Sequence, residues 1–86
     1  MSKNTITQEH VDKIIEKTKI VYETFGNTTL VGVCTLPNGW VEVFDASCID
    51  PENFDIEVGK QIILKRLNNK IWELEGYLLQ CKLSGW

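Results

Sequence analysis

The sequence has 86 residues, a length typical of a single domain, and a net charge of −3 from interspersed acidic and basic residues. This balance gives no electrostatic reason to expect duplex nucleic acid as a partner. No apolar run approaches the roughly 20 residues that a membrane-spanning helix needs, and the N-terminus lacks the hydrophobic region of a secretory signal.

Residues 7–19 carry the pattern of a first helix. Thr7 is a favoured N-cap residue type, and Val11 stands where a hydrophobic staple closes on Ile6. Apolar residues then follow at helical spacing. The pattern can continue through residues 21–25, but their β-branched and aromatic side chains fit an extended segment equally well. Gly26-Asn27 ends either one.

Two strands are expected next, over residues 28–36 and 40–46, joined by Pro37-Asn38-Gly39. Asn-Gly between β-rich runs is the strongest short signal of a hairpin. A two-residue turn at Asn38-Gly39 pairs Pro37 with Trp40, which places Cys34 opposite Val43.

With that register, each face of the hairpin carries apolar side chains. The face expected to lie on the C-terminal helix holds Leu30, Cys34, Leu36, Val41 and Val43, with a gap at Gly32. The second face holds Val31, Val33, Trp40 and Phe44, together with Thr35 and Glu42. It is unusually apolar for a surface in water, so the first helix, a sister subunit or a flat aromatic ligand is expected to cover it.

Residues 50–79 predict a long amphipathic helix. Asp50 suits the N-cap and Pro51 the first turn, while Asn53 offers a second cap, so a short turn before the main helix fits equally well. Asn68-Asn69 and Gly76 are poor helix formers and leave its continuity open. One apolar stripe runs along it: Ile56, Ile63, Leu67, Ile71, Leu74, Leu78 and Cys81.

These elements predict an α+β fold in one domain, residues 1–86. Its N-terminal helix precedes an antiparallel β-hairpin, a small sheet on which the long C-terminal helix packs. A chain this short buries only about 60–65% of its unfolded surface, so a partner subunit is expected to supply further burial.

Few residues suit metal binding, disulfides or catalysis. The three cysteines, Cys34, Cys48 and Cys81, form no CxxC pair, and an odd number without a secretory signal predicts reduced thiols in a cytosol. The single histidine, His10, and the missing zinc-ligand spacings predict no metal site and no nucleophilic triad. We therefore expect no cofactor and no enzymatic activity.

Arg66 and Lys70 are four residues apart, hence neighbours on one helix face. Two adjacent cations can grip a phosphate or pyrophosphate, although such a pair is usually a solvated stripe. An aromatic side chain nearby would favour binding, because it could stack on a base.

Several sequence blocks form a specific pattern: Thr7-x-Glu9-x-Val11, the strand from Thr29 to Cys34, Asn38-Gly39-Trp40, Asp50-Pro51-x-Asn53-Phe54-Asp55, Gly59, and the segment from Lys70 to Leu79. In these blocks the chain resembles a family of small tailed-phage proteins and is similar to the products of an N4-type coliphage and a Shigella phage. This resemblance covers nearly the whole chain and implies a phage protein, without a particular activity.

The size, element order and Arg66/Lys70 pair also resemble the first type of Thoeris anti-defence sponge. Those small α+β phage proteins dimerise, assemble further and bind a cyclised ADP-ribose product of host TIR enzymes, and some bind cyclic oligonucleotides at a separate site. The similarity implies a homo-oligomer, at least a dimer, in the host cytoplasm. Its role would be to sequester a Thoeris or CBASS signalling nucleotide without cleaving it. The present chain is shorter than those proteins.

In that interpretation, cations hold phosphates, an aromatic ring stacks on the base and carboxamides supply hydrogen bonds. The candidate residues are Arg66 and Lys70 for phosphate, Trp40 or Phe44 for stacking, and Asn38 and Asn53 for hydrogen bonding. The alternative is a phage protein–protein interaction module that inhibits a host protein through the apolar sheet face.

Overall fold

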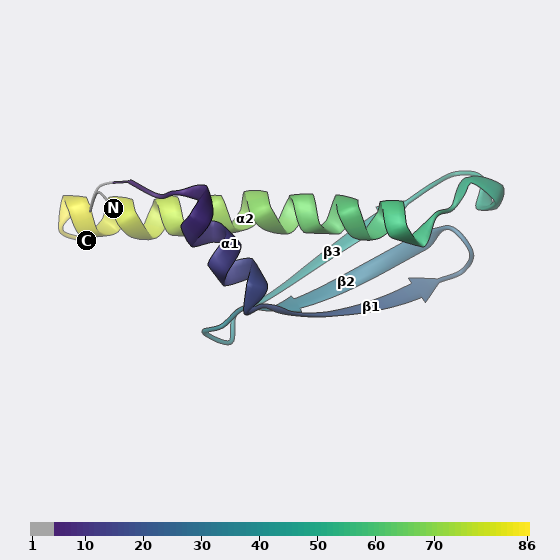
Figure 1. Cartoon of the computed structure of the whole chain (residues 1–86), viewed down its shortest axis with the longest axis horizontal. Coiled ribbons are helices and arrows are strands. Elements are labelled where there is room, and N and C mark those ends of the chain that lie inside the picture. The colour runs from purple at the N-terminus through teal and green to yellow at the C-terminus, as the bar shows by residue number, and fades with distance from the viewer. Residues whose placement is uncertain (1–4) are drawn as a thin grey trace.

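The computed structural model describes residues 5–86. Its elements are helix α1 (Gln8–Glu16), strands β1 (Lys19–Phe25), β2 (Thr29–Thr35) and β3 (Val41–Ser47), the 3-10 helix η1 (Pro51–Asn53) and helix α2 (Ile56–Ser84). The strands form one antiparallel sheet in the order β1-β2-β3, and α2 packs on one face against β2 and β3. The predicted α+β fold is confirmed, with one strand more than the hairpin (Figure 1).

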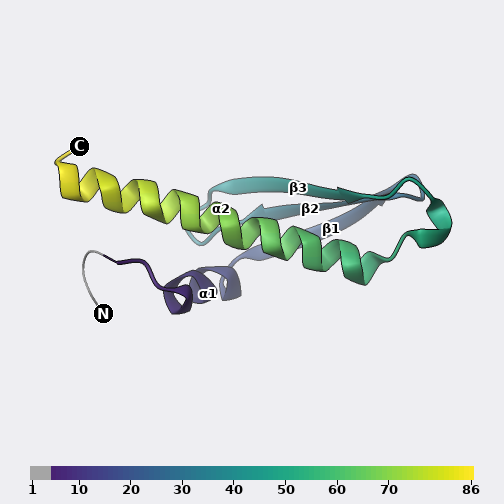
Figure 2. The same ribbon diagram turned by 90° about the horizontal axis from the view of Figure 1, so that it is seen from above.

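Helix α1 begins where the sequence predicts. The Thr7 hydroxyl accepts a hydrogen bond from the backbone N–H of His10 at 3.2 Å, and Val11 is fully buried. The helix packs against α2, next to the end of the sheet where β1 begins (Figure 2). It ends at Glu16, and the next segment is β1, so the extended alternative for residues 21–25 is correct.

The predicted register of β2 and β3 is wrong by one residue. The turn has three residues, because Leu36 pairs with Trp40: its N–H donates to the Trp40 carbonyl at 2.8 Å, and its carbonyl accepts from Gly39 at 2.9 Å. Pro37 and Asn38 form the turn, and Gly39 adopts φ +92°, the arrangement of a type I turn followed by a glycine bulge. Cys34 therefore lies opposite Glu42, and Val33 opposite Val43.

A shift of one residue turns every side chain of β3 to the other face. Val41 and Val43, predicted beneath the helix, lie on the outer face and are exposed. Phe44, predicted on the outer face, packs against the core on the helix side. Trp40 and Glu42 also belong to the helix side, since Leu36 and Cys34 opposite them are buried there.

Helix α2 follows a short turn, as one of the two sequence alternatives allows. Asp50 caps η1, but the N-cap of α2 is Asp55 rather than Asn53: its carboxylate accepts from the Glu57 N–H at 2.9 Å. The helix is continuous through Asn68-Asn69 and Gly76. It ends at Gly85, where φ is +79° and the Trp86 N–H bonds to the Cys81 carbonyl at 2.9 Å.

The core lies between α2 and the sheet, with α1 closing one side. Its fully buried side chains are Val11, Leu30, Cys34, Ile63, Leu67 and Ile71. Two glycines allow the layers to approach closely. A Cβ at Gly59 would lie 3.0 Å from Leu30 Cδ2, and one at Gly32 would lie 2.9 Å from Ile63 Cγ2. The gap that the sequence leaves at Gly32 is therefore filled by Ile63.

Replacing glycine by alanine is expected to change stability in opposite directions at two other positions, 76 and 39. Gly76→Ala is expected to raise the free energy of unfolding by about 0.5–1 kcal/mol, because alanine is the better helix former and an added Cβ meets no atom within 4 Å. Gly39→Ala is expected to lower it by about 1–2 kcal/mol, because alanine is strained at positive φ. Urea denaturation of both variants checks the signs, and a shift of both in one direction would contradict them.

Candidate functional site

The β2–β3 turn brings two of the candidate ligand residues together. The Asn38 side-chain oxygen accepts from the Trp40 backbone N–H at 3.0 Å, and the Trp40 indole donates to Glu42 at 2.7 Å. Both residues line a groove of about 210 Å³, which is smaller than the roughly 300–1,000 Å³ of ordinary ligand pockets. Its other walls are Ile14, Leu36, Ile71, Leu74, Glu75 and Leu78, so its one ionisable group is a carboxylate, which would repel phosphate.

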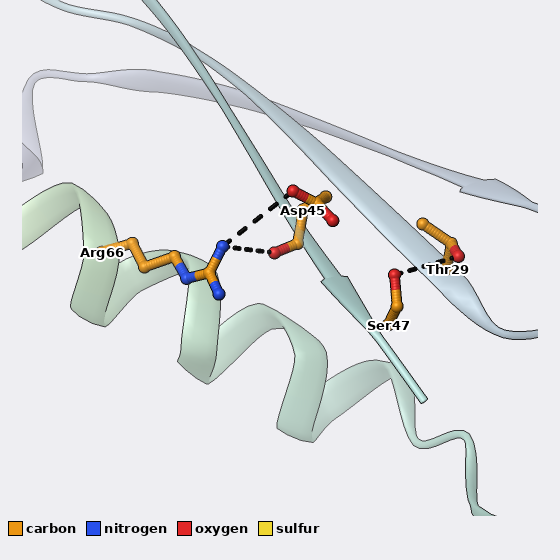
Figure 3. Close-up of polar contacts among 4 residues, drawn as sticks. All are labelled: Thr29, Asp45, Ser47 and Arg66. Atoms are coloured by element: carbon orange, nitrogen blue, oxygen red, sulfur yellow. Dashed lines mark hydrogen bonds and ion pairs between the residues drawn. The ribbon is translucent and has the colours of Figure 1, made fainter. Parts of the chain in front are cut away.

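The two candidate phosphate ligands already have partners within the chain. Arg66 Nη1 donates to the Asp45 carbonyl at 3.0 Å and lies 4.0 Å from Asp45 Oδ1, which ties α2 to β3 (Figure 3). Lys70 Nζ lies 3.2 Å from Glu73 Oε2. Exposed pairs of this kind contribute only about 0–1 kcal/mol, so they are weak tethers. Neither cation lines the groove beside Trp40.

The remaining two candidates lie elsewhere. Phe44 is half-buried against the core. Asn53 belongs to η1, which follows β3, while Asn38 and Trp40 belong to the β2–β3 turn that precedes it. The β2–β3 turn and the connection from β3 to α2 lie at opposite ends of the sheet (Figure 1). The structure thus joins Asn38 with Trp40 but does not gather the six candidate residues around one pocket.

The outer face of the sheet carries Val31, Val33 and Thr35 as the sequence predicts, but the β3 side chains on it were assigned incorrectly. No described element covers it. We call Val21, Val31, Val33, Val41 and Val43 the valine face; Val21, Val33 and Val43 form one cross-strand row and are 54%, 37% and 59% exposed. The rows on either side are Lys19–Thr35–Val41 and Glu23–Val31–Asp45, and the last is Phe25–Thr29–Ser47, where the two hydroxyls lie 3.1 Å apart (Figure 3).

In the sequence, the signal for this surface is the alternation of apolar and polar residues along the three strands. Val21 was left between helix and strand, and Val41 and Val43 were assigned to the wrong face by the register error. Only the pairing of the strands shows that three valines stand side by side. An apolar row flanked by charged and polar rows is a typical composition for a contact surface.

The C-terminal part of α2 extends past the sheet (Figure 2). Tyr77, Leu78, Leu83 and Trp86 are exposed there. The apolar stripe that contains Ile63 and Leu67 thus continues through Leu78, beyond the surface that it covers. This end of the helix is a second apolar surface, separate from the valine face.

Within residues 5–86, no three histidine, cysteine or acidic side chains are grouped so that they could hold a metal ion. In the same part of the chain, no helix is both long enough and apolar enough to cross a membrane.

A family model places the chain among known proteins. The model of the phage protein family described as N4 Gp49/phage Sf6 gene 66 matches residues 6–83. The chain belongs to this family. No curated protein and no solved structure matches it. The sequence-based resemblance to small phage proteins is therefore confirmed, and the similarity to Thoeris sponges stays a hypothesis.

The most enclosed reactive group of this phage protein is the Cys34 thiol. Burial raises its pKa above the ordinary value, and the Glu42 carboxylate raises it further. Burial likewise raises the pKa of Tyr22, with smaller contributions from Cys34 and Glu57. Since the thiolate is the nucleophile, this protonated thiol is a core residue and a poor catalyst.

The three thiols are expected to react at different rates. Cys48 and Cys81 are partly exposed and should be modified rapidly by a disulfide reagent at pH 8, whereas Cys34 should react only on unfolding. Because folding raises the pKa of Cys34, the contribution of this thiol to the free energy of unfolding is complete below its unfolded pKa, about 8.5. That contribution is lost as the pH rises through the pKa of Cys34 in the folded protein. Three equally fast thiols would contradict the expectation, and a Cys34→Ser variant identifies the slow one.

Proposed function

We propose that this phage protein acts by binding a host protein through the valine face and performs no catalysis itself. The observation that carries the proposal is the row of Val21, Val33 and Val43, exposed on the face of the sheet that α2 does not cover. Complete burial of a fully exposed valine gains about 1.5–3 kcal/mol, and these three are about half exposed, so each would gain roughly half of that at an interface.

The row Glu23–Val31–Asp45, next to the three valines, indicates what kind of host surface would fit the valine face. Glu23 and Asp45 lie on either side of Val31, and among residues 5–86 only Asp45 has a cation, Arg66, within ion-pair distance. A host surface with an apolar strip and a basic side chain next to it would complement both rows.

The test compares two valines of similar exposure. Val43 lies on the valine face and Val58 on α2, with exposures of 59% and 51%. Proteins that cross-link to the phage protein in host cells are identified, purified and titrated against it by calorimetry. Val43→Glu should weaken binding at least tenfold, which corresponds to about 1.4 kcal/mol, while Val58→Glu should leave it unchanged.

Two results would reject this function. One is the absence of any purified host protein that binds the phage protein directly. The other is an equal loss of binding in both variants, because the contact would then not depend on the valine face. Denaturation of both variants verifies that they are folded.

One observation favours sequestration of a signalling nucleotide as a second candidate. Trp40 is half exposed beside Asn38 in the groove, so its indole is accessible for stacking on a base. Cyclic ADP-ribose isomers and cyclic di- and trinucleotides are titrated by calorimetry against the purified chain and against Trp40→Ala. Micromolar or tighter binding that the substitution abolishes supports sequestration, and no binding by any of them removes it. Recovery of intact ligand from the denatured complex separates sequestration from hydrolysis.

A further inference from the structure

The two edges of the sheet differ in how they are covered. The backbone of α2 lies over β3 and β2, and it reaches β1 through side chains alone, such as Lys60 above the Tyr22 ring. At the β3 edge, Arg66 donates to the backbone carbonyl of Asp45 (Figure 3). At the β1 edge, no strand of the described chain pairs with the outer side of Lys19–Phe25. Unpaired edges of this kind are ready templates for another strand, and β1 contains no proline to prevent it.

The backbone groups free at this edge follow from the turn geometry. The Leu36 N–H bonds to Trp40, so even-numbered residues of β2 bond to β3 and odd-numbered ones to β1. The odd-numbered residues of β1 are opposite odd-numbered residues of β2. Ile20, Tyr22 and Thr24 therefore direct their N–H and C=O groups outward.

The sequence of β1 complements itself in an antiparallel pair. If Val21 lies on a two-fold axis, Lys19 of each copy stands opposite Glu23 of the other, and Ile20 stands opposite Tyr22. Opposite charges and aromatic with β-branched residues are both favourable cross-strand pairs. Moving the axis to Tyr22 would place Lys19 opposite Phe25 and lose both ion pairs. If the axis lay midway between two residues, each side chain that points toward α2 in one copy would stand opposite a side chain of the outer face in the other copy.

The helix layer leaves room for this pairing. An open depression of about 390 Å³ lies on the inner side of β1, beside Tyr22 and between Ile56 and Lys60 of α2. Lys60 Nζ stands 5.1 Å from the centre of the Tyr22 ring. Ile20 and Tyr22 are only half-buried in one copy, so pairing would bury more of their apolar surface without displacing α2.

We propose that two copies of this chain pair antiparallel through β1, with Val21 at the two-fold axis. The product is an isologous dimer with a continuous sheet of six strands, three from each copy. It joins the two valine rows into one, which would double the surface available to a partner. In the dimer, Lys19 of the other copy stands opposite Glu23, so Asp45 is then the carboxylate of this row that remains for a basic side chain of the host protein. The pairing itself does not depend on the proposed function.

The test exchanges charges at two exposed positions, so the fold is left intact. Lys19→Glu sets two carboxylates opposite each other at both ends of the pair, and Glu23→Lys sets two ammonium groups opposite each other. Each single variant is expected to raise the dimer dissociation constant about tenfold in sedimentation experiments. The double variant should return it to the wild-type value, because the ion pairs are restored in the reverse sense.

Mixing the two single variants tests the geometry directly. In a mixed pair every position brings opposite charges together, so the two weakly associating chains should form a heterodimer as tight as the wild-type dimer. A wild-type chain that sediments as a monomer at millimolar concentration would overturn the proposal. A dimer that none of the charge changes affects would overturn it too. Host-protein binding, measured with Val43→Glu as above, reports on the function separately.

Discussion

Truncating Leu67 to alanine is expected to lower the free energy of unfolding by about 2–5 kcal/mol. Leu67 has no exposed surface and stands in the middle of the α2 stripe, between Ile63 and Ile71, where the helix packs on the sheet. Alanine leaves a cavity that the packed layers fill only in part. A chain of 86 residues has about 4–13 kcal/mol of stability in total, so this one change could remove about half of it.

Leu83→Ala is the matched control for this measurement. Leu83 is the same residue type on the same helix, but it is exposed in the part that extends past the sheet. Its truncation should change the free energy of unfolding by no more than about 0.5 kcal/mol. Urea denaturation should show a lower midpoint for Leu67→Ala with an unchanged slope. Equal midpoints for the two variants would contradict the assignment of the core.

Replacing Gly32 with valine is expected to lower the free energy of unfolding by about 1–3 kcal/mol, although valine is the better strand former. A Cβ at this position would lie 2.9 Å from Cγ2 and 3.3 Å from Cδ1 of Ile63. Ile63 is fully buried, so it has little space into which to move. Thr35→Val, on the outer face of the same strand, is the control and should have little effect.

A double variant tests whether the contact with Ile63 is the cause. Ile63→Ala alone removes buried methyl groups and should cost about 2–5 kcal/mol. In the double variant with Gly32→Val, the valine methyl groups enter the space that Ile63→Ala vacates. The double variant should therefore lose less free energy of unfolding than the sum of the losses of the two single variants. Additivity within about 0.5 kcal/mol would mean that the two side chains do not compete for the same volume.

The candidate ligand site could not be assembled from the sequence because its geometry depends on strand register. Trp40 and Phe44 were expected on an open face, and the ligand hypothesis required one of them to lie near Arg66 and Lys70. A three-residue turn places Phe44 against the core and Trp40 in a small groove, whereas the two cations pair with Asp45 and Glu73. The exposed apolar surface was anticipated with Val31 and Val33 on it, but Val21 was not assigned to a face and Val41 and Val43 were expected beneath the helix.

Local signals determined much of this protein. A helix cap requires only a few neighbouring residues, so the caps Thr7 and Asp50 were identified from the sequence. The apolar stripe of α2 follows from helical spacing, and its central residues Ile63, Leu67 and Ile71 are buried.

Where the local sequence favoured two structures equally, only the tertiary structure decided between them. The segment Lys19–Phe25 is a strand because β2 offers it an edge on which to pair, and Asn68-Asn69 stays helical within a helix that packing holds on the sheet. The loop of three residues instead of two exposes Val41 and Val43, because a strand alternates its faces at every residue and β3 must bury Phe44 and Ala46 beneath α2.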